Sequence, residues 1–263
     1  MPSRFSRPRL IDENDKQYQA FVARIMLTKD NYRAIRPPRA RDLFGGEVEA
    51  ALRGWLSQYY DLSDRRIIEY LEHRGRSAIT KYRELDAVVL EESKHAHVFE
   101  VKASQKAASL RRAARQLHDT RQILEMLFTR VYTTILLVDT GIPTTEDIAA
   151  IMHSSDVPSE LPLTLNELLT QLPHLQLIGS LEQRVLDPTI INVLCFSVDD
   201  IIEMAGAENL HLNWDDEDDQ QPPPSKTQEF HSYTTESTDD KDDDSPMAEA
   251  FKRALADRQD HDS

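Results

Sequence analysis

Residues 47–138 alternate between helical and strand-like patterns, and this alternation limits the possible folds more than any other feature of the sequence. A helical stretch from Glu47 to about Tyr60 precedes strand-like segments at 64–72, 80–90 and 97–103. A long helix, about 105–130, separates these from Val131–Val138, whose β-branched and aromatic residues are typical of a buried strand. The order predicts an α/β fold with a central mixed β-sheet and helices on both faces.

Further elements are expected on both sides of this core. Helical patterns cover Asp15–Thr28, Thr145–Ser154, Leu165–Leu172 and Val198–Ala205, and short strands are predicted at Leu175–Ile178 and Ile190–Phe196. The last three helices each follow a capping residue, namely Thr144, Thr164 and Ser197. Glu167 completes a capping-box pattern with Thr164, and Asp147 stands three residues after Thr144.

The composition changes sharply after Trp214, where acidic and proline runs replace the apolar patterns. Such a segment carries too little apolar surface to offset the entropy of an ordered chain, so we expect a disordered acidic tail. The predicted organisation is a basic N-terminal arm with a helix (1–41), one folded domain (42–212), a disordered acidic linker (213–245) and a short amphipathic helix with a tail (246–263).

Charge is distributed unevenly along the chain, whose net charge is −15. Residues 215–263 hold 16 acidic against 5 basic side chains, so the tail accounts for −11 of that total. Residues 1–41 hold 10 Lys and Arg against 4 acids, and residues 101–130 hold 7 against 2. Because phosphate binding depends on local basic faces, the net charge does not exclude a nucleic-acid partner.

The single cysteine, Cys195, excludes a disulfide framework within one chain and a zinc site built on several cysteines. Its apolar neighbours predict a core thiol. The longest apolar runs are too short to span a bilayer, and residues 1–10 lack the apolar stretch of a secretory signal. These features favour a cytoplasmic protein that does not contact a membrane.

The segment Tyr82–Ser104 carries the residues most suited to chemistry. Side chains alternate faces along a strand, so Glu100 and Lys102 point to the same side, and a polar connection at 91–94 allows Asp86 to approach them. Two buried carboxylates repel each other unless a cation lies between them, and magnesium prefers carboxylate oxygens together with water and phosphate. The same residues also fit an ordinary surface hairpin with incidental charges.

This segment resembles the PD-(D/E)xK nuclease superfamily through Asp86 and the triplet Glu100-Val101-Lys102. The resemblance implies a restriction-endonuclease-like core over about residues 44–138, Mg²⁺ or Mn²⁺ bound by Asp86, Glu100 and the Val101 carbonyl, and a catalytic Lys102. It also implies a helix carboxylate, for which Glu47 is the first candidate and Glu49 the second. Gln116 matches the glutamine of the RecB-type branch, although Thr120 stands where a tyrosine often follows.

The expected function is hydrolysis of nucleic-acid phosphodiesters, with DNA favoured over RNA. Basic residues on the helix after the site are the candidate phosphate contacts: Lys106, Arg111, Arg112, Arg115 and Arg121. The N-terminal arginines fit a nucleic-acid arm or a partner-binding tail. The acidic tail fits a solubilising segment, an autoinhibitory segment or, through Met247–Arg258, a docking helix for a protein partner. The alternative function is a binding or assembly module that recruits proteins through the acidic C-terminal half.

Overall fold

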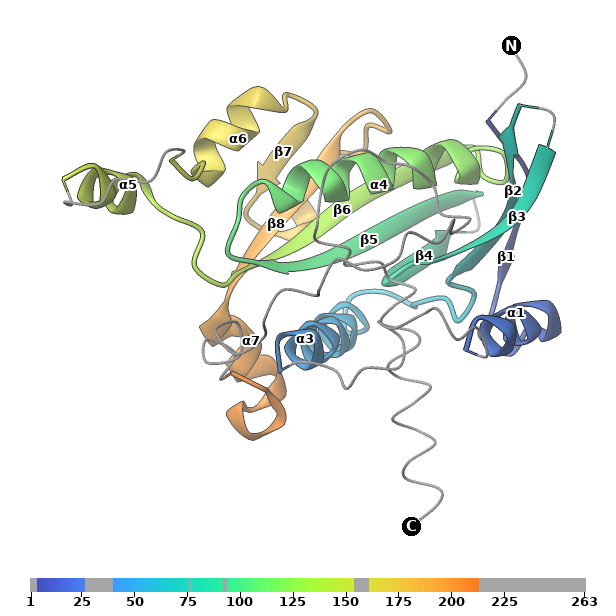
Figure 1. The fold of residues 1–263 in the computed structure, drawn as a ribbon, viewed down its shortest axis with the longest axis horizontal. Helices are drawn as coiled ribbons and strands as arrows, with labels where there is room; N and C mark the ends of the chain where they lie inside the picture. The colour runs from blue at the N-terminus through green and yellow to red at the C-terminus, as the bar shows by residue number, and fades with distance from the viewer. Residues whose placement is uncertain (1–3, 27–39, 76, 92–93, 154–160, 213–263) are drawn as a thin grey trace, which may run out of the picture.

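The computed structural model describes residues 4–26, 40–75, 77–91, 94–153 and 161–212, which form an α/β fold (Figure 1). Its larger sheet contains β4 Ala87–Glu91, β5 His95–Ser104, β6 Arg130–Asp139, β7 Leu175–Ile178 and β8 Ile191–Ser197. These strands lie in the order β4–β5–β6–β8–β7. β4 and β5 are antiparallel and the other pairs are parallel, so the sheet is mixed, as predicted.

A second, antiparallel sheet contains β1 Phe5–Ile11, β2 Ile67–Arg74 and β3 Ser77–Glu84 in the order β1–β2–β3. The segment predicted as one strand, residues 80–90, is therefore two strands in two sheets. β3 ends at Glu84 and β4 begins at Ala87, so Leu85 and Asp86 connect the sheets. The sequence pattern did not reveal the end of β3, because Leu85 is apolar and buried like the strand residues around it.

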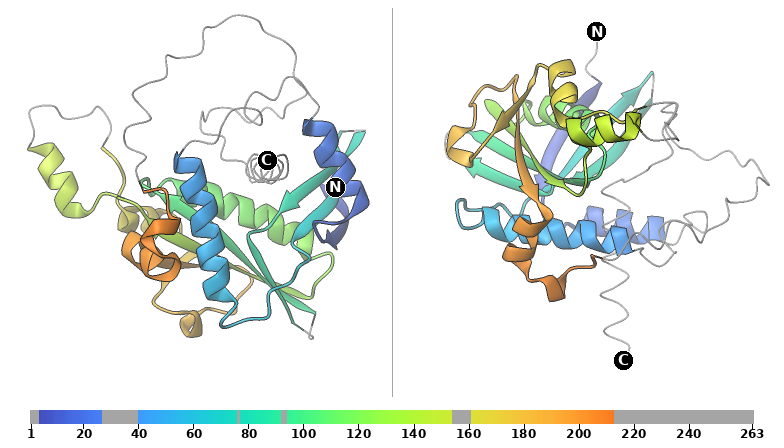
Figure 2. Two further views of the ribbon diagram at one scale, coloured as in Figure 1. Left: turned by 90° about the horizontal axis from the view of Figure 1, so that it is seen from below. Right: turned by 90° about the vertical axis from the view of Figure 1, so that its left-hand side faces the viewer.

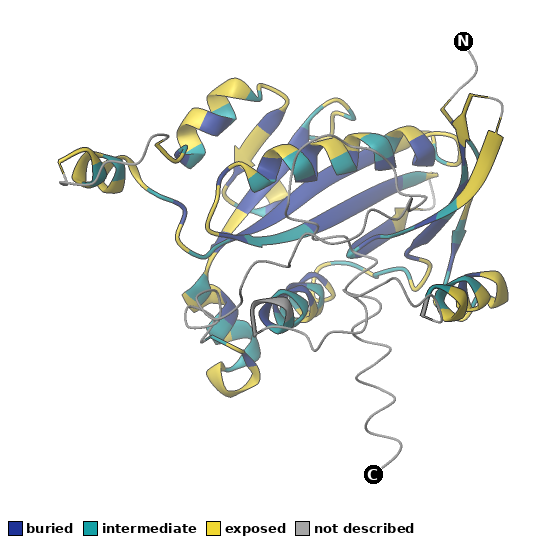
Figure 3. Cartoon of the chain, in the orientation of Figure 1, coloured by how far each residue is buried: buried dark blue, intermediate teal, exposed yellow. Residues whose placement is uncertain are grey.

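Helices cover both faces of the larger sheet (Figures 1 and 2). The helices of the fold are α1 Lys16–Met26, α3 Ala40–Leu56, α4 Ser109–Leu124, α5 Thr145–Met152, α6 Leu165–Gln171 and α7 Val198–Ala205. Of these, α1 packs on the smaller sheet through Tyr18, and α5 buries none of its residues. Helix α4 packs on one face together with Val98 and Ile135. Helices α3 and α7 pack on the other face with Phe99 and Leu136. Consecutive strand residues therefore enter two different apolar layers, which is the reason these strands are apolar throughout (Figure 3).

The helix predictions agree with the structure in kind and differ at some ends. Helix α4 is shorter than the predicted 105–130, because the Ser104 hydroxyl accepts a hydrogen bond from the Lys106 amide and holds a turn before the helix. Helix α3 begins at Ala40, ahead of the predicted Glu47. The capping residues Thr144, Thr164 and Ser197 are confirmed, each within a reciprocal capping box.

Two expectations for particular residues are corrected. Residues 5–11, for which no strand was predicted within the N-terminal arm, form strand β1, and Pro8 is tolerated there because β1 is an edge strand. Cys195, expected in the core, is exposed on β8. The acidic tail and Met247–Arg258 lie outside the described residues. Among the described residues, no helix is both long and apolar enough to cross a membrane.

His97 is a buried ionisable group within the larger sheet, 2% exposed. Its Nε2 lies 2.8 Å from the Thr134 hydroxyl, and its ring stacks on Phe99. Burial, followed by the charge of Arg184, lowers the pKa of His97 to about 3. The unfolded chain, with a histidine pKa of about 6.5, therefore binds a proton that the folded chain excludes.

The free energy of unfolding is expected to fall as the pH drops from about 6.5 towards 3, by up to about 1.4 kcal/mol per pH unit from His97. His97→Gln removes this titration, so its stability should fall less steeply over the same range. Denaturant unfolding at several pH values measures the slope. His118→Gln is the matched control, because His118 is exposed. Parallel pH profiles for wild type and His97→Gln would contradict the prediction.

Candidate functional site

Strand β5 directs Glu100 and Lys102 towards the face covered by α4, as the strand alternation predicts. Glu100 is buried, with 1% of its surface exposed, whereas the side chain of Lys102 is 19% exposed. The Lys102 Nζ atom lies 2.9 Å from Glu100 Oε1. A buried carboxylate and a partly exposed ammonium group are therefore adjacent where this face meets solvent.

Asp86 reaches the same place from the connection between β3 and β4. Ala87 pairs with Phe99, so Asp86 lies one position beyond the last β4–β5 pair, next to Glu100 and Val101. The Val101 amide donates a hydrogen bond to Asp86 Oδ2 at 2.6 Å. This bond continues the pairing between the two segments through a side chain and fixes the carboxylate beside Glu100.

The environment of Asp86 disfavours its negative charge. Burial is the largest cause that raises its pKa well above the ordinary value, and the charges of Glu100 and Glu49 raise it further. Lys102 and the Val101 amide act in the opposite direction without balancing these effects. Three carboxylates thus interact at one place, where a bound cation would relieve their repulsion.

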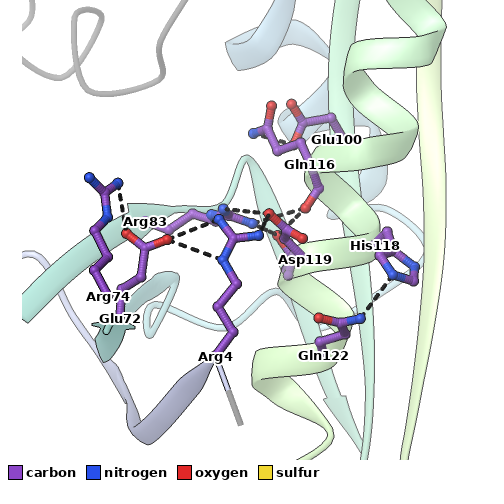
Figure 4. Close-up of polar contacts among 10 residues, drawn as sticks. Arg4, Glu72, Arg74, Arg83, Glu100, Gln116, His118, Asp119 and Gln122 are labelled. Atoms are coloured by element: carbon purple, nitrogen blue, oxygen red, sulfur yellow. Dashed lines mark hydrogen bonds and ion pairs between the residues drawn. The ribbon is translucent and has the colours of Figure 1, made fainter. Parts of the chain in front are cut away.

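Helix α4 contributes Gln116, whose Nε2 donates to Glu100 Oε2 at 3.2 Å (Figure 4). The backbone carbonyl of Gln116 accepts a hydrogen bond from Arg83 of β3 at 2.9 Å, and Arg83 also donates to the Thr120 hydroxyl at 2.8 Å. The smaller sheet therefore holds the turn of α4 that presents Gln116 to the buried carboxylate.

The structure brings Glu49, the second candidate, to the site and does not bring Glu47 there. The Glu47 carboxylate pairs with the His211 ring and accepts a hydrogen bond from the His211 amide at 2.7 Å. Residues two apart on a helix point about 200° away from each other, so the two glutamates face different neighbours. Glu49 is buried and lies three residues before Leu52, which also faces the core. This helical spacing is the sequence signal that favours Glu49.

The donor groups fit a hard divalent cation. Glu100 Oε1 is buried and accepts no hydrogen bond, although Lys102 lies within ion-pair distance of it. Among the described residues, no group of three or more His, Cys, Asp and Glu side chains is arranged to hold a metal ion. Magnesium is commonly held by one or two carboxylates with water and phosphate, so Asp86 and Glu100 alone provide a suitable protein contribution.

The basic residues predicted to contact phosphate differ in whether their side chains are already bonded within the protein. Arg111 donates to Gln171, and Arg121 donates to the Pro188 carbonyl and lies 3.8 Å from Glu125, so both are engaged within the protein. Arg115, like Lys106, is exposed, and Arg112 is half-buried. In the N-terminal segment, Arg4 pairs with Glu72 and Asp119 (Figure 4), and Arg9 pairs with Glu69. These two arginines stabilise β1 on the fold.

Two arginines near Asp86 were not singled out from the sequence. Arg53 of α3 donates to the Asp86 carbonyl at 2.9 Å. Arg66, which is 8% exposed, donates to the Leu85 carbonyl at 3.4 Å and pairs with Glu84 and Glu49. The available signal was the position of Arg53, four residues after Glu49 and thus on the same side of the helix.

Comparison with known proteins identified no similar protein. A scan against protein-family models, a search of curated proteins and a search of solved structures each give no match.

Asp86→Asn is expected to stabilise the metal-free protein near pH 8, because it removes a buried charge and keeps an oxygen for the Val101 amide. A gain of about 1 kcal/mol would raise Tm by about 2–4 °C. The raised pKa of Asp86 means that its ionisation costs stability as the pH rises. The gain should therefore shrink towards pH 4, where the wild-type carboxyl is protonated. Thermal unfolding with chelator at both pH values measures it, and equal or lower Tm at pH 8 would contradict the prediction.

Proposed function

We propose that this protein is a metal-dependent nuclease that hydrolyses phosphodiester bonds of nucleic acid, with DNA as the favoured substrate. The observation that carries the proposal is the convergence of Asp86, Glu100 and Lys102 at one end of the β4–β5 pair. A buried pair of carboxylates beside an ammonium group is a costly arrangement for a fold alone, and it suits metal-assisted hydrolysis.

The mixed sheet with helices on both faces agrees with a restriction-endonuclease-like core, and we include this finer assignment in the proposal. The β4–β5 hairpin supplies the carboxylates, and helix α3 before it supplies the additional glutamate. The spacing of Asp86, Glu100 and Lys102 along the sequence agrees with the PD-(D/E)xK resemblance of this segment.

In the proposed site, Asp86 and Glu100 would hold Mg²⁺ or Mn²⁺, with the Val101 carbonyl as a further oxygen donor. The bound ion supplies a water of lowered pKa and neutralises charge on the phosphate. Lys102, whose Nζ lies 2.9 Å from Glu100 Oε1, would orient the attacking water and balance the charge on the phosphate. Gln116 holds Glu100 in one orientation through its amide. The water oxygen would form a bond to phosphorus while the bond from phosphorus to one ester oxygen breaks, and the proton lost by the water would reach the leaving oxygen through solvent.

Asp86→Ala, Glu100→Ala and Lys102→Ala are each expected to lower cleavage by at least about 100-fold, because each removes a group that touches the metal or the reacting phosphate. The assay uses single- and double-stranded DNA and RNA with Mg²⁺, Mn²⁺ or chelator. Glu125→Gln, which changes an exposed carboxylate at the C-cap of α4, is the control for loss of charge. Wild-type activity in the three alanine variants, or no cleavage of any substrate by wild type, would exclude the nuclease and favour the binding module.

Glu49→Gln is expected to weaken Mn²⁺ binding by about tenfold, because the Glu49 charge acts on Asp86. Glu47→Gln should leave Mn²⁺ affinity within about twofold of wild type and loosen the contact with His211. Mn²⁺-dependent thermal stabilisation measures both. A larger effect from Glu47→Gln than from Glu49→Gln would show that the helix carboxylate is misassigned.

A further inference from the structure

Leu85 and Asp86 belong to neither sheet, and their carbonyls accept hydrogen bonds from two arginine side chains. The Leu85 amide donates to the Arg66 carbonyl at 2.8 Å, and the carbonyls of Leu85 and Asp86, which lie outside the strands, require donors. Arg66 Nη1 lies 3.4 Å from the Leu85 carbonyl, and Arg53 Nη1 lies 2.9 Å from the Asp86 carbonyl. A buried carbonyl without a donor is costly, so these contacts hold the connection in place.

The two guanidinium groups come from α3 and from the segment that connects it to β2. Arg53 lies on α3, four residues after Glu49, and Arg66 lies just before β2. Burial, followed by the charge of Arg66, lowers the pKa of Arg53. Two positively charged guanidinium groups therefore lie close together, each donating to one of two neighbouring carbonyls. If these carbonyls were paired within a β-sheet, backbone amides would take the place of the arginines.

Arg66 also links this connection to the other acidic groups. It lies 2.5 Å from Glu84 and 3.9 Å from Glu49, and it forms an ion pair with Glu13 from the turn between β1 and α1. Its guanidinium thus joins the residue before Leu85, the helix glutamate and the N-terminal segment. A shift of Arg66 would move both the Asp86 backbone and the Glu49 side chain.

We infer that Arg53 and Arg66 are positioning residues: they fix the Leu85–Asp86 backbone so that the Asp86 carboxylate stays on the Val101 amide, beside Glu100. Arg66 in addition fixes Glu49. Both arginines contact main-chain carbonyls or other side chains, so they act through Asp86 and Glu49. Their effect on cleavage rests on the proposed nuclease function, whereas their effect on the placement of Asp86 does not.

Arg53 is the better residue for the test. Arg66 pairs with Glu13, Glu49 and Glu84, and its replacement would remove a cation shared by all three, with a risk of unfolding. Arg53→Met keeps the apolar stem and removes the donor to Asp86, while Arg53→Lys keeps a donor. The readout is hydrogen exchange of the Val101 amide by NMR in the full chain, normalised to amides of β6.

Arg53→Met should accelerate Val101 exchange by about tenfold relative to β6, because the bond to Asp86 loosens, and Arg53→Lys should recover part of the protection. In the cleavage assay with Mn²⁺, Arg53→Met should lower kcat by about 10–100-fold and leave KM for nucleic acid within about twofold. Arg184→Met is the matched control, since Arg184 also bonds a main-chain carbonyl, that of Leu181, and the Tyr60 hydroxyl, away from the site.

The outcomes separate the two proposals. Unchanged Val101 exchange in Arg53→Met overturns the positioning role, whatever the activity. An increase in KM and a changed salt dependence with unchanged kcat also overturns it, because Arg53 would then contact phosphate directly. Faster Val101 exchange together with a wild type that cleaves no substrate would support the positioning role and reject the nuclease.

Discussion

The hydrogen bond from the Val101 amide to Asp86 is the contact on which the site depends. At 2.6 Å it joins a strand of the larger sheet to the connection that arrives from the smaller sheet. It is the bond that ties the Asp86 carboxylate to β5 beyond the last strand pair, because the β4–β5 pairing ends at Ala87 and Phe99. The Asp86 side chain therefore replaces a backbone hydrogen bond between strands. It uses one carboxylate oxygen, so the other oxygen can contact a different partner.

Charge explains why the surroundings of this bond contain so many arginines. Asp86, Glu100, Glu49 and Glu84 are close to one another, and buried carboxylates are tolerated only when they are paired, protonated or bound to a cation. Arg66 and Lys102 each neutralise part of this group from one side. The Asp86 carboxylate accepts a hydrogen bond from the Val101 amide and keeps a raised pKa, so the negative charges of this group are not fully balanced at Asp86.

Local patterns predicted most of the larger sheet and its helices, because their signals are contained in short segments. The capping boxes at Thr144 and Thr164 and the apolar run of β6 depend on neighbours a few residues away. The division at Leu85 and Asp86 could not be predicted in the same way, because the apolar alternation continues through it. Arg53 and Arg66 were missed since their partners, the carbonyls of Asp86 and Leu85, lie 33 and 19 residues further along. Such contacts are set by tertiary packing, which a single sequence does not show.

The smaller sheet gives the N-terminal segment a role different from a free basic arm. Arg4 and Arg9 pair with carboxylates of β2 and α4, and Glu13 pairs with Arg66. Arg83 of β3 holds the α4 backbone at Gln116, while Arg66, directly before β2, holds Leu85 and Glu49. The two sides of the site, the Gln116–Glu100 side and the Asp86–Glu49 side, are thus both supported by one three-stranded unit. The separation of Asp86 and Glu100 therefore depends on how the two sheets are joined, since residues at the junction hold both sides of the site.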